Sequence, residues 1–235
     1  MITSTESGDG KTFLSSNMAT LYASTGKKTV LVDLDIRKPN LHTKLGLDGG
    51  KGLSNYLAGD CELDDVLVKN SPFGFDFLRA GVIPPNPGEL IHSDRMMTMV
   101  AKLREEYEFV IIDTSPIGLV PDAYALLDQV DVCLYVVRCL QTNKRFCKEA
   151  LDQLKEVVDM PDKIQLVLSD IPTEHSQGHG YGYGYGYGYG YGYGYGHYGY
   201  HSYAMDRVHR VYRTYRKLVY KEEDKEPYKY YSDDE

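Results

Sequence analysis

Short apolar runs alternate with amphipathic segments along about the first 170 residues of the chain. The runs are rich in Val, Ile and Leu and lack polar alternation, which is typical of parallel strands buried on both faces. They lie at Thr29–Asp33, Phe75–Arg79, Glu108–Thr114, Val132–Arg138 and Gln165–Ser169. This alternation predicts a doubly wound α/β fold with a mostly parallel sheet and right-handed crossovers.

Two helices can be assigned from the pattern between these runs. From Asn143 to Val158, apolar residues recur at the spacing of one helix face. They are Phe146, Ala150, Leu151, Leu154, Val157 and Val158. Another helix is expected after Pro84-Pro85-Asn86-Pro87, because three prolines in four positions form a rigid turn.

The composition changes abruptly from Gln177 onward, where tyrosine and glycine dominate. Of the 22 tyrosines, 17 lie in the last 55 residues, and eight Tyr-Gly dyads run from Tyr181 to Gly196. Glycine at every second position disfavours a stable strand, so we expect a flexible linker. The predicted organisation is a folded domain over 1–174, a Tyr-Gly linker over 175–203, a basic amphipathic helix over 204–221 and an acidic tyrosine-containing tail over 222–235.

Charge and cysteine usage narrow the class of protein. The formal net charge of −8 lies within residues 1–180, which argues against general nucleic-acid affinity. The four cysteines form no Cys-x-x-Cys pair and fit a reducing cytosol, and Cys133 and Cys139 are expected in the core. The sequence has no signal peptide and no apolar stretch of the ~18 residues that a membrane helix needs. We therefore expect a cytoplasmic protein.

The first strand of the predicted sheet is unusually short. Only Met1, Ile2 and Thr3 precede a glycine-rich loop, whereas a buried strand normally has about five or six residues. We expect this strand to be truncated and weakly held.

Residues Thr5 to Thr12 read Thr-Glu-Ser-Gly-Asp-Gly-Lys-Thr and fit a phosphate-binding Walker A loop whose first glycine is replaced by Thr5. Gly8, Asp9 and Gly10 would offer backbone N–H groups to phosphates, and the following helix N-terminus adds its positive end. Lys11 would reach the β- and γ-phosphate oxygens and the hydroxyl of Thr12 would bind Mg²⁺. The alternative is an ordinary glycine-rich turn. The motif indicates a domain of the P-loop NTPase type that binds ATP and Mg²⁺.

Two further apolar runs end in carboxylates. Val30-Leu31-Val32 leads to Asp33 and Asp35, which point to the same side of an extended chain. Phe109-Val110-Ile111-Ile112 leads to Asp113, as in a Walker B strand. Because open α/β sheets bind ligands at the carboxyl ends of their strands, we expect the three aspartates at one site, with one holding a metal and another accepting a proton.

These motifs, in this order, resemble those of the bacterial tyrosine kinases (BY-kinases), the cytoplasmic autokinases of capsule and exopolysaccharide export. The segment 32–42, Val-Asp-Leu-Asp-Ile-Arg-Lys-Pro-Asn-Leu-His, is similar to their Walker A′ motif. Segments 52–59 and 83–90 and the C-terminal tyrosine cluster are also similar to family signatures. The resemblance covers about residues 2–171. The tail resembles the family only in containing a tyrosine cluster.

The resemblance implies roles for individual residues. Lys11 and Thr12 bind ATP–Mg²⁺, Asp113 and Asp35 support the metal, and Asp33 is the base or orienter for a tyrosine hydroxyl. The sequence departs from the family at Ser115, where the Walker B segment usually has proline. It also departs after the last core strand, where Ser169-Asp170 replaces an expected asparagine, which makes Asp170 the candidate contact to the base. The family's upstream arginine-containing helix, which helps to build a ring, is not in this sequence.

The tyrosine-rich tail is the expected substrate, phosphorylated in trans by a neighbouring copy. The first candidates are those in the acidic tail, and the others follow toward the linker: Tyr228, Tyr230, Tyr231, Tyr220, Tyr215, Tyr212 and Tyr203. The dyad tyrosines Tyr181–Tyr195 are either substrate or spacer. The arginine stripe Arg207–Arg216 is either a solvated helix face or a docking face for the acidic domain of a neighbour.

The resulting hypothesis is an ATP-dependent protein-tyrosine autokinase that regulates polysaccharide polymerisation or export. Expected partners are a second copy of the chain, a membrane co-polymerase or activator segment and a protein-tyrosine phosphatase, with no nucleic acid. The expected location is the inner face of the plasma membrane, through a parent segment or partner. The alternatives are a ParA/MinD-type ATP-switch ATPase and an inactive truncated adaptor.

Overall fold

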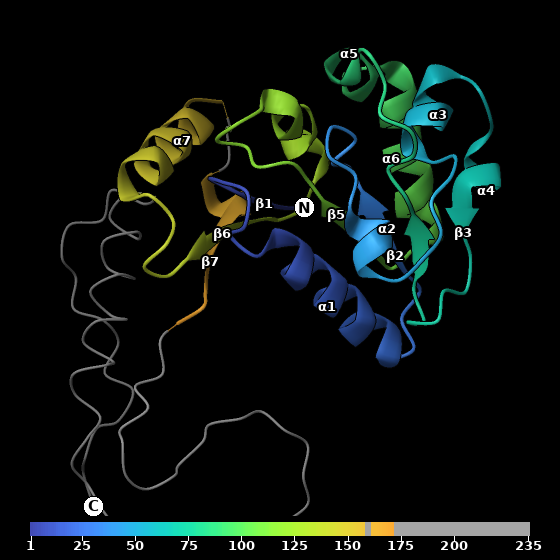
Figure 1. Cartoon of the computed structure of the whole chain (residues 1–235), viewed down its shortest axis with the longest axis horizontal. Helices are drawn as coiled ribbons and strands as arrows, with labels where there is room; N and C mark the ends of the chain where they lie inside the picture. Colours follow the sequence, from blue (N-terminus) through green and yellow to red (C-terminus); the bar gives the residue numbers. More distant parts are fainter. Residues whose placement is uncertain (158–160, 172–235) are drawn as a thin grey trace, which may run out of the picture.

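A seven-stranded sheet forms the centre of the computed structural model, which describes residues 1–157 and 161–171 (Figure 1). The strand order is β3-β4-β2-β5-β1-β6-β7. All neighbours are parallel except β3 and β4, which are antiparallel. The strands are β1 (Ile2–Ser4), β2 (Thr29–Asp33), β3 (Leu67–Val68), β4 (Asp76–Leu78), β5 (Phe109–Asp113), β6 (Cys133–Arg138) and β7 (Ile164–Ser169). The prediction of a doubly wound, mostly parallel α/β fold is confirmed.

The sequence pattern located every parallel strand to within one or two residues at each end. It did not predict β3, because a pair of apolar residues gives no measurable periodicity. β1 is a three-residue strand, yet it lies in the middle of the sheet between β5 and β6. Ile2 pairs with Asp113 on one side and Leu134 on the other, and its side chain is 1% exposed.

Helices cover both faces of the sheet. Within the described residues the α-helices are α1 (Lys11–Ser24), α2 (Leu41–Lys44), α3 (Leu53–Ala58), α4 (Leu63–Val66), α5 (Pro87–Ile91), α6 (Asp94–Glu106) and α7 (Lys144–Val157), and the 3₁₀-helices are η1 (Pro121–Gln129) and η2 (Pro161–Lys163). In Figure 1, α1 and α2 lie below the sheet, and α3, α5, α6 and α7 lie above it. Helix α5 begins at Pro87, as the proline-rich turn predicts.

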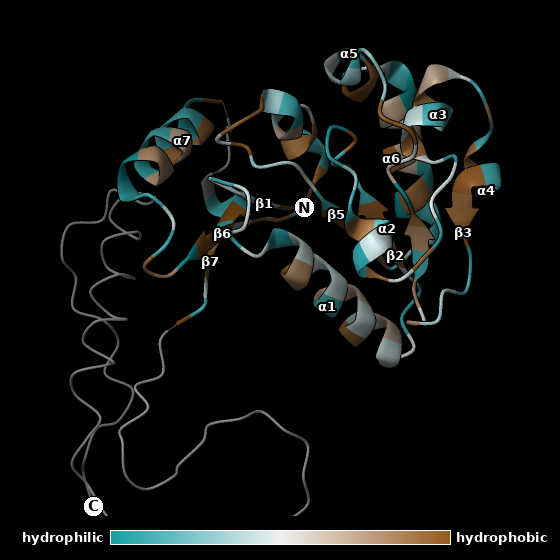
Figure 2. Cartoon of the chain, viewed as in Figure 1, coloured by the Kyte–Doolittle hydropathy of each residue, from teal (hydrophilic) through white to brown (hydrophobic). Residues whose placement is uncertain are grey.

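Alternate residues of each strand enter two separate hydrophobic cores. Leu31 and Ile111 belong to the core under α1, whereas Val30, Val32 and Ile112 belong to the larger core on the opposite face. In Figure 2 the strands are mostly brown and α7 is teal along its outer side, whereas α1 is mostly pale. Burial on both faces explains why the strand segments are continuously apolar in the sequence.

The buried face of α7 differs from the prediction. Phe146 and Val157 are 52% and 57% exposed, whereas Cys147, Ala150, Leu151 and Leu154 are buried. The buried face therefore includes Cys147, which the predicted stripe lacked, and excludes Phe146 and Val157, which it contained. Cys133 and Cys139 are buried, as predicted.

Several predicted segments lie outside the described residues: the linker, the basic helix, the acidic tail and Val158. The domain boundary at 174 also lies outside them. Among the described helices, none combines the length and apolar character needed to span a membrane.

Candidate active site

The sheet brings the ends of three neighbouring strands to one edge. β1 leads into the glycine-rich loop and α1, β2 ends at Asp33 and β5 ends at Asp113. Asp33 and Asp113 are direct partners in the β2–β5 register, so their Cα atoms are about 4.8 Å apart. Both follow by two residues a side chain of the core under α1, so alternation points both carboxylates to the side of α1.

The glycine-rich loop has the backbone conformation that a phosphate cradle needs. Gly8 and Gly10 have φ values of +95° and +103°, in the left-handed region that side chains disfavour. The carboxylate of Asp9 turns inward and is fully occupied. Its Oδ2 accepts from the Glu6 N–H at 2.8 Å, and its Oδ1 accepts from the Thr142 hydroxyl at 2.7 Å. Asp9 therefore holds the loop with its side chain and can face a phosphate only with its backbone.

The ends of β6 and β7 support the same loop from outside. Arg138 Nη1 donates to the carbonyl of Gly8 at 3.2 Å, and the Ser169 hydroxyl donates to the carbonyl of Asp9 at 2.9 Å. Asp170, the predicted contact to the base, has φ +53° and pairs with Arg138 Nε at 3.0 Å. Its side chain is 55% exposed beside the loop. Arg138 and Thr142 could not be predicted as part of the site, since neither lies in a recognisable sequence motif.

Lys11 lies folded over the loop at the start of α1. Its Nζ donates to the Ser4 hydroxyl at 3.1 Å and approaches the carbonyl of Glu6 at 3.5 Å. Burial lowers the pKa of Lys11 below its ordinary value, opposed chiefly by the negative charge of Asp113. A buried ammonium group whose hydrogen bonds go to neutral oxygens retains the capacity to bind a strong anion such as phosphate.

Asp33 and Asp113 are buried carboxylates with unused hydrogen-bonding capacity. They are 1% and 3% exposed, and Asp33 Oδ2 and Asp113 Oδ1 have no hydrogen-bond partner among the described residues. Burial raises the pKa of Asp33 to about 8, with a further contribution from Asp113. Burial also raises the pKa of Asp113 to about 6, although Thr12 and Lys11 oppose this shift. Two such carboxylates side by side indicate a site that receives a cation.

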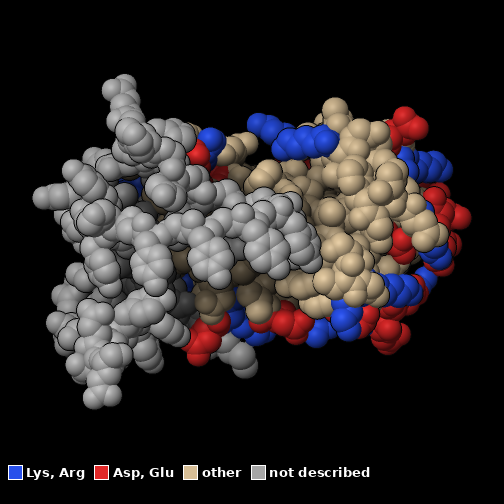
Figure 3. Space-filling view, turned by 90° about the horizontal axis from the view of Figure 1, so that it is seen from below, with Lys and Arg blue, Asp and Glu red and all other residues tan. Residues whose placement is uncertain are grey.

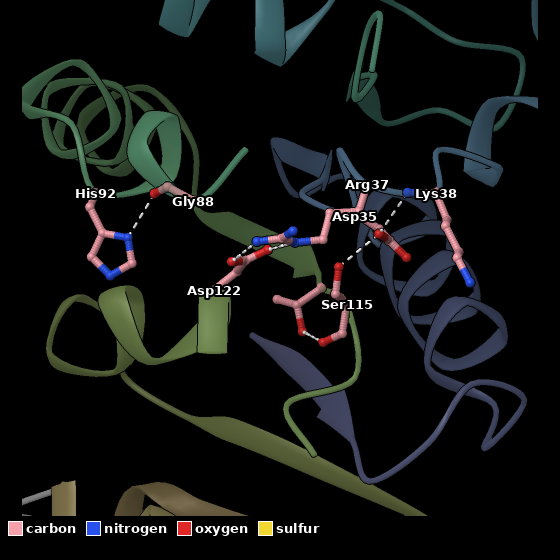
Figure 4. A network of polar contacts seen from close by, with 8 residues as sticks. Asp35, Arg37, Lys38, Gly88, His92, Ser115 and Asp122 are labelled. Atoms are coloured by element: carbon pink, nitrogen blue, oxygen red, sulfur yellow. Dashed lines mark hydrogen bonds and ion pairs between the residues drawn. The ribbon is translucent and has the colours of Figure 1, made fainter. Parts of the chain in front are cut away.

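Asp35, the second aspartate of the predicted pair, has a different environment. It follows the end of β2 and is partly exposed. Its Oδ1 accepts from the Ser115 hydroxyl at 2.7 Å and from the Lys38 N–H at 3.1 Å (Figure 4). The departure from proline at Ser115 therefore supplies a hydroxyl that orients Asp35.

A bidentate ion pair lies beside Asp35 and was not predicted from the sequence. Arg37 Nε and Nη2 donate to the two carboxylate oxygens of Asp122 at 2.6 and 2.8 Å (Figure 4). Asp122 lies in η1 and is 3% exposed. A Cβ atom added to Gly88 of α5 would lie 3.7 Å from Arg37 Nη2, so α5 adjoins the pair. No sequence signal links Arg37 to Asp122, which is 85 residues away.

The donor set at this edge fits Mg²⁺. Among the described residues no three His, Cys, Asp or Glu side chains form a metal cage. Mg²⁺ at nucleotide sites is bound by one or two protein oxygens together with phosphates and water, so a cage is not required. Thr12, Asp113 and Asp35 are the candidate ligands, and the unpartnered Asp113 Oδ1 is an available acceptor close to Thr12.

A cavity of about 510 Å³ lies elsewhere, at the amino ends of β1, β5 and β6. Its lining includes Met18 and Tyr22 of α1 and Val100 and Tyr107 of α6. It is therefore at the opposite edge of the sheet from the aspartates. The predicted acceptor tyrosines, Tyr203, Tyr212, Tyr215, Tyr220, Tyr228, Tyr230 and Tyr231, lie outside the described residues.

Residues 1–166 match the family model of the CobQ/CobB/MinD/ParA nucleotide binding domain. The chain is 38% identical over 150 residues to the putative tyrosine-protein kinase CapB of Staphylococcus aureus, covering 64% of this chain and 66% of CapB. It is 38% identical over 138 residues to the tyrosine-protein kinase etk of Escherichia coli K12, covering 59% of this chain and 19% of etk. The chain thus spans about a fifth of etk and two thirds of CapB.

Solved structures give the same relationship. The kinase domain of the Escherichia coli tyrosine kinase ETK has a TM-score of 0.70 and 32% identity, with 78% of this chain and 71% of that chain covered. The VpsO kinase domain has a TM-score of 0.66 and 33% identity, with coverages of 72% and 81%. MinD from Pyrococcus horikoshii, complexed with Mg-ADP, shares the fold at 23% identity and a TM-score of 0.56, with coverages of 70% and 65%.

The same family is indicated by the strand-end aspartates, by the glycine-rich loop and by these relatives. The chain belongs to the CobQ/CobB/MinD/ParA family of nucleotide-binding domains and, within it, to the bacterial tyrosine-kinase (BY-kinase) branch.

Proposed function

We propose that this chain transfers the γ-phosphoryl group of ATP to tyrosine. The observation that carries this proposal is the pair of buried aspartates, Asp33 and Asp113, which are partners across β2 and β5 and each have an unpartnered oxygen. Asp113 also interacts with Lys11 and Thr12 at the end of the glycine-rich loop. One carboxylate can support a cation while the other remains available to a hydroxyl proton. The names of the relatives, tyrosine-protein kinases, support the choice of acceptor.

The proposed reaction assigns a task to each residue. The N–H groups of the loop at Gly8, Asp9 and Gly10 and the ammonium of Lys11 bind the phosphates. Thr12, Asp113 and Asp35 hold Mg²⁺, which when bound neutralises charge on the phosphates. The tyrosine oxygen forms a bond to the γ-phosphorus, its proton passes to Asp33, and the bond to the bridging oxygen breaks so that ADP leaves. A raised pKa makes Asp33, once ionised, a stronger base than an ordinary aspartate.

The proposed acceptors are the chain's own C-terminal tyrosines, phosphorylated in trans by a second copy. Each phosphate adds about −1.5 to −2 charge, which would repel the acidic domain of a neighbour and loosen an assembly. A protein-tyrosine phosphatase would reverse the modification.

The proposed cellular role is control of capsule or exopolysaccharide polymerisation and export. Two relatives have names that point this way: CapB and the putative tyrosine-protein kinase in the cps region of Klebsiella pneumoniae. A chimerical protein CapA2B2, 34% identical with a TM-score of 0.65, supports a membrane co-polymerase segment as activating partner. The proposed location is the inner face of the plasma membrane, through that segment or partner.

The test is a phosphotransfer assay with mapping of the products. The purified chain is incubated with ATP and Mg²⁺, alone and with a candidate activating segment, beside Lys11→Ala. We expect phosphotyrosine in 203–231 in the unsubstituted chain and its loss in Lys11→Ala. ATP hydrolysis without phosphotyrosine under both conditions would contradict the kinase proposal, and labelling that persists in Lys11→Ala would indicate a contaminating kinase.

A second candidate is a ParA/MinD-type ATP switch, favoured by the family model and by the shared fold of MinD. It predicts ATP-dependent dimerisation and hydrolysis without tyrosine transfer. The same assay separates the two, and a chain that neither binds nor hydrolyses ATP would instead be an adaptor.

A further inference from the structure

Arg37 has no task in the phosphate chemistry described above, yet it lies two residues beyond Asp35. Its position is fixed by Asp122, which accepts hydrogen bonds from Nε and Nη2 at 2.6 and 2.8 Å. The side chain of Asp122 is 4% exposed, whereas that of Arg37 is 35% exposed. A bidentate contact to a buried carboxylate fixes the plane of the guanidinium and leaves part of it facing solvent.

The second edge of this guanidinium is available. Within residues 1–157 and 161–171, Arg37 Nη1 donates no hydrogen bond. In Figure 4 the guanidinium extends from the Asp35 loop toward η1, above Ser115. The exposed side chain of Lys38 follows Arg37 in the same loop. A fixed guanidinium with one open edge, beside the residues that receive a hydroxyl, is suited to a carboxylate.

Long-range charge does not favour such a ligand. The chain carries a net charge of −8, and acidic and basic side chains alternate along the rim of the face in Figure 3. An acidic peptide would therefore gain affinity only through a local contact. Asp35 would repel it in the absence of a cation, and bound Mg²⁺ offsets that repulsion.

The chain contains three kinds of tyrosine segment that differ in charge. The dyads from Tyr181 to Tyr195 have no charged neighbours. Tyr212, Tyr215 and Tyr220 lie in the basic segment 204–221, whereas Tyr228, Tyr230 and Tyr231 lie in the acidic segment. Asp233, Asp234 and Glu235 follow Tyr231 after one serine. A carboxylate contact beside the acceptor would therefore distinguish them.

We propose that the open edge of the Arg37 guanidinium, held in place by Asp122, binds a carboxylate next to the acceptor tyrosine, so that this site selects acidic tyrosyl segments. The inference rests on the proposed kinase function and adds the substrate class. The contact is partly exposed, so we expect about tenfold selection, equivalent to about 1.4 kcal/mol.

The test compares three peptides as phosphate acceptors for the full chain with ATP and Mg²⁺. One has the sequence of 228–235, the second replaces Asp233, Asp234 and Glu235 by their amides, and the third is a Tyr-Gly repeat. The variant is the double substitution Arg37→Gln/Asp122→Asn, which removes both charges and so leaves no buried carboxylate unpaired. Its matched control is Arg104→Gln/Asp131→Asn, which removes an ion pair of 3.0 Å on the exposed surface at the cavity edge.

We expect kcat/KM to be about tenfold higher for the acidic peptide than for its amide form in the unsubstituted chain and in the control. The ratio should fall to about one in Arg37→Gln/Asp122→Asn, with KM for ATP unchanged. In the unsubstituted chain, which needs no variant to fold, the ratio should also fall as salt rises from about 0.1 to 1 M, because the Debye length shrinks from about 10 to 3 Å.

Equal kcat/KM for the acidic and amide peptides in the unsubstituted chain would overturn the inference and leave the kinase proposal intact. A ratio that survives in Arg37→Gln/Asp122→Asn would overturn the role of Arg37. ATP hydrolysis with no phosphotyrosine on any peptide would overturn the kinase function itself.

Discussion

Four buried aspartates at one edge of the sheet fall into two kinds. Asp9 and Asp122 have both carboxylate oxygens bonded, by Glu6 and Thr142 in one case and by Arg37 in the other. Asp33 and Asp113 are as deeply buried, but each has one oxygen without a partner among the described residues. Residue type and burial are the same, so the hydrogen-bond partners distinguish the carboxylates that hold the fold from those available for chemistry.

The largest expected effect is a loss of catalysis when Asp33, one of the two aspartates with an unpartnered oxygen, is replaced. Asp33→Asn removes the proposed base and should lower kcat for tyrosine phosphorylation by about 10²- to 10⁴-fold. KM for ATP should change little, because Asp33 is not among the proposed phosphate ligands. Initial rates of phosphotyrosine formation measure this. Asp131→Asn, an exposed aspartate at the cavity edge, should keep full activity, and equal losses in both variants would refute the distinction.

The second-largest effect should be a loss of unfolding free energy when the Arg37–Asp122 ion pair is broken. Arg37→Ala leaves the carboxylate of Asp122 buried without a partner and should cost about 3–5 kcal/mol of unfolding free energy. Asp122→Ala leaves a guanidinium on a side chain that is 35% exposed and that water can reach, so its cost should be smaller, about 1–3 kcal/mol. Urea unfolding measures both. A larger loss for Asp122→Ala than for Arg37→Ala would contradict this account of the pair.

Replacing Asp33 by asparagine is expected to stabilise the protein by an amount that depends on pH. Its pKa is raised from an ordinary 3.8 to about 8, so the folded state holds the proton more tightly than the unfolded chain does. The stability contribution of Asp33 is therefore full below about pH 4 and is lost progressively as the pH rises toward 8. Asp33→Asn has no such loss. Without Mg²⁺ and nucleotide, its melting temperature should exceed that of the unsubstituted chain by several degrees at pH 8 and by less at pH 5.

A constant difference between pH 5 and pH 8 would show that Asp33 does not titrate between these values. Asp131→Asn serves again as the control, since an exposed aspartate should give no pH-dependent difference.

The smallest effect should come from the support of the glycine-rich loop. Thr142→Val removes the hydroxyl that donates to Asp9 at 2.7 Å and should cost about 1–2 kcal/mol of stability. Since Asp9 also holds the Glu6 N–H, nucleotide affinity should fall with stability. Thermal unfolding and ADP titration measure the two, with Thr20→Val on the exposed side of α1 as the control. Unchanged nucleotide affinity would show that the loop keeps its shape without Thr142.

The sequence supplied much of the site because its residues lie within local motifs. Gly8, Gly10, Lys11 and Thr12 are contiguous, and Asp33 and Asp113 each close an apolar strand, so spacing and periodicity were sufficient to find them. Arg37–Asp122, Thr142–Asp9 and Arg138–Gly8 were not found. These contacts join residues 85, 133 and 130 positions apart, and nothing local to either partner requires the other.

The sequence by itself determined the parallel strands, the phosphate loop and the aspartates that end β2 and β5, because hydrophobic periodicity and chain-local geometry depend on near neighbours. The tertiary structure decided which of these aspartates have hydrogen-bond partners. That depends on strand register and on loops that meet only when the sheet is assembled, and it separates Asp33 and Asp113 from Asp9 and Asp122. The same dependence decided which face of α7 is buried and brought Asp122 against Arg37.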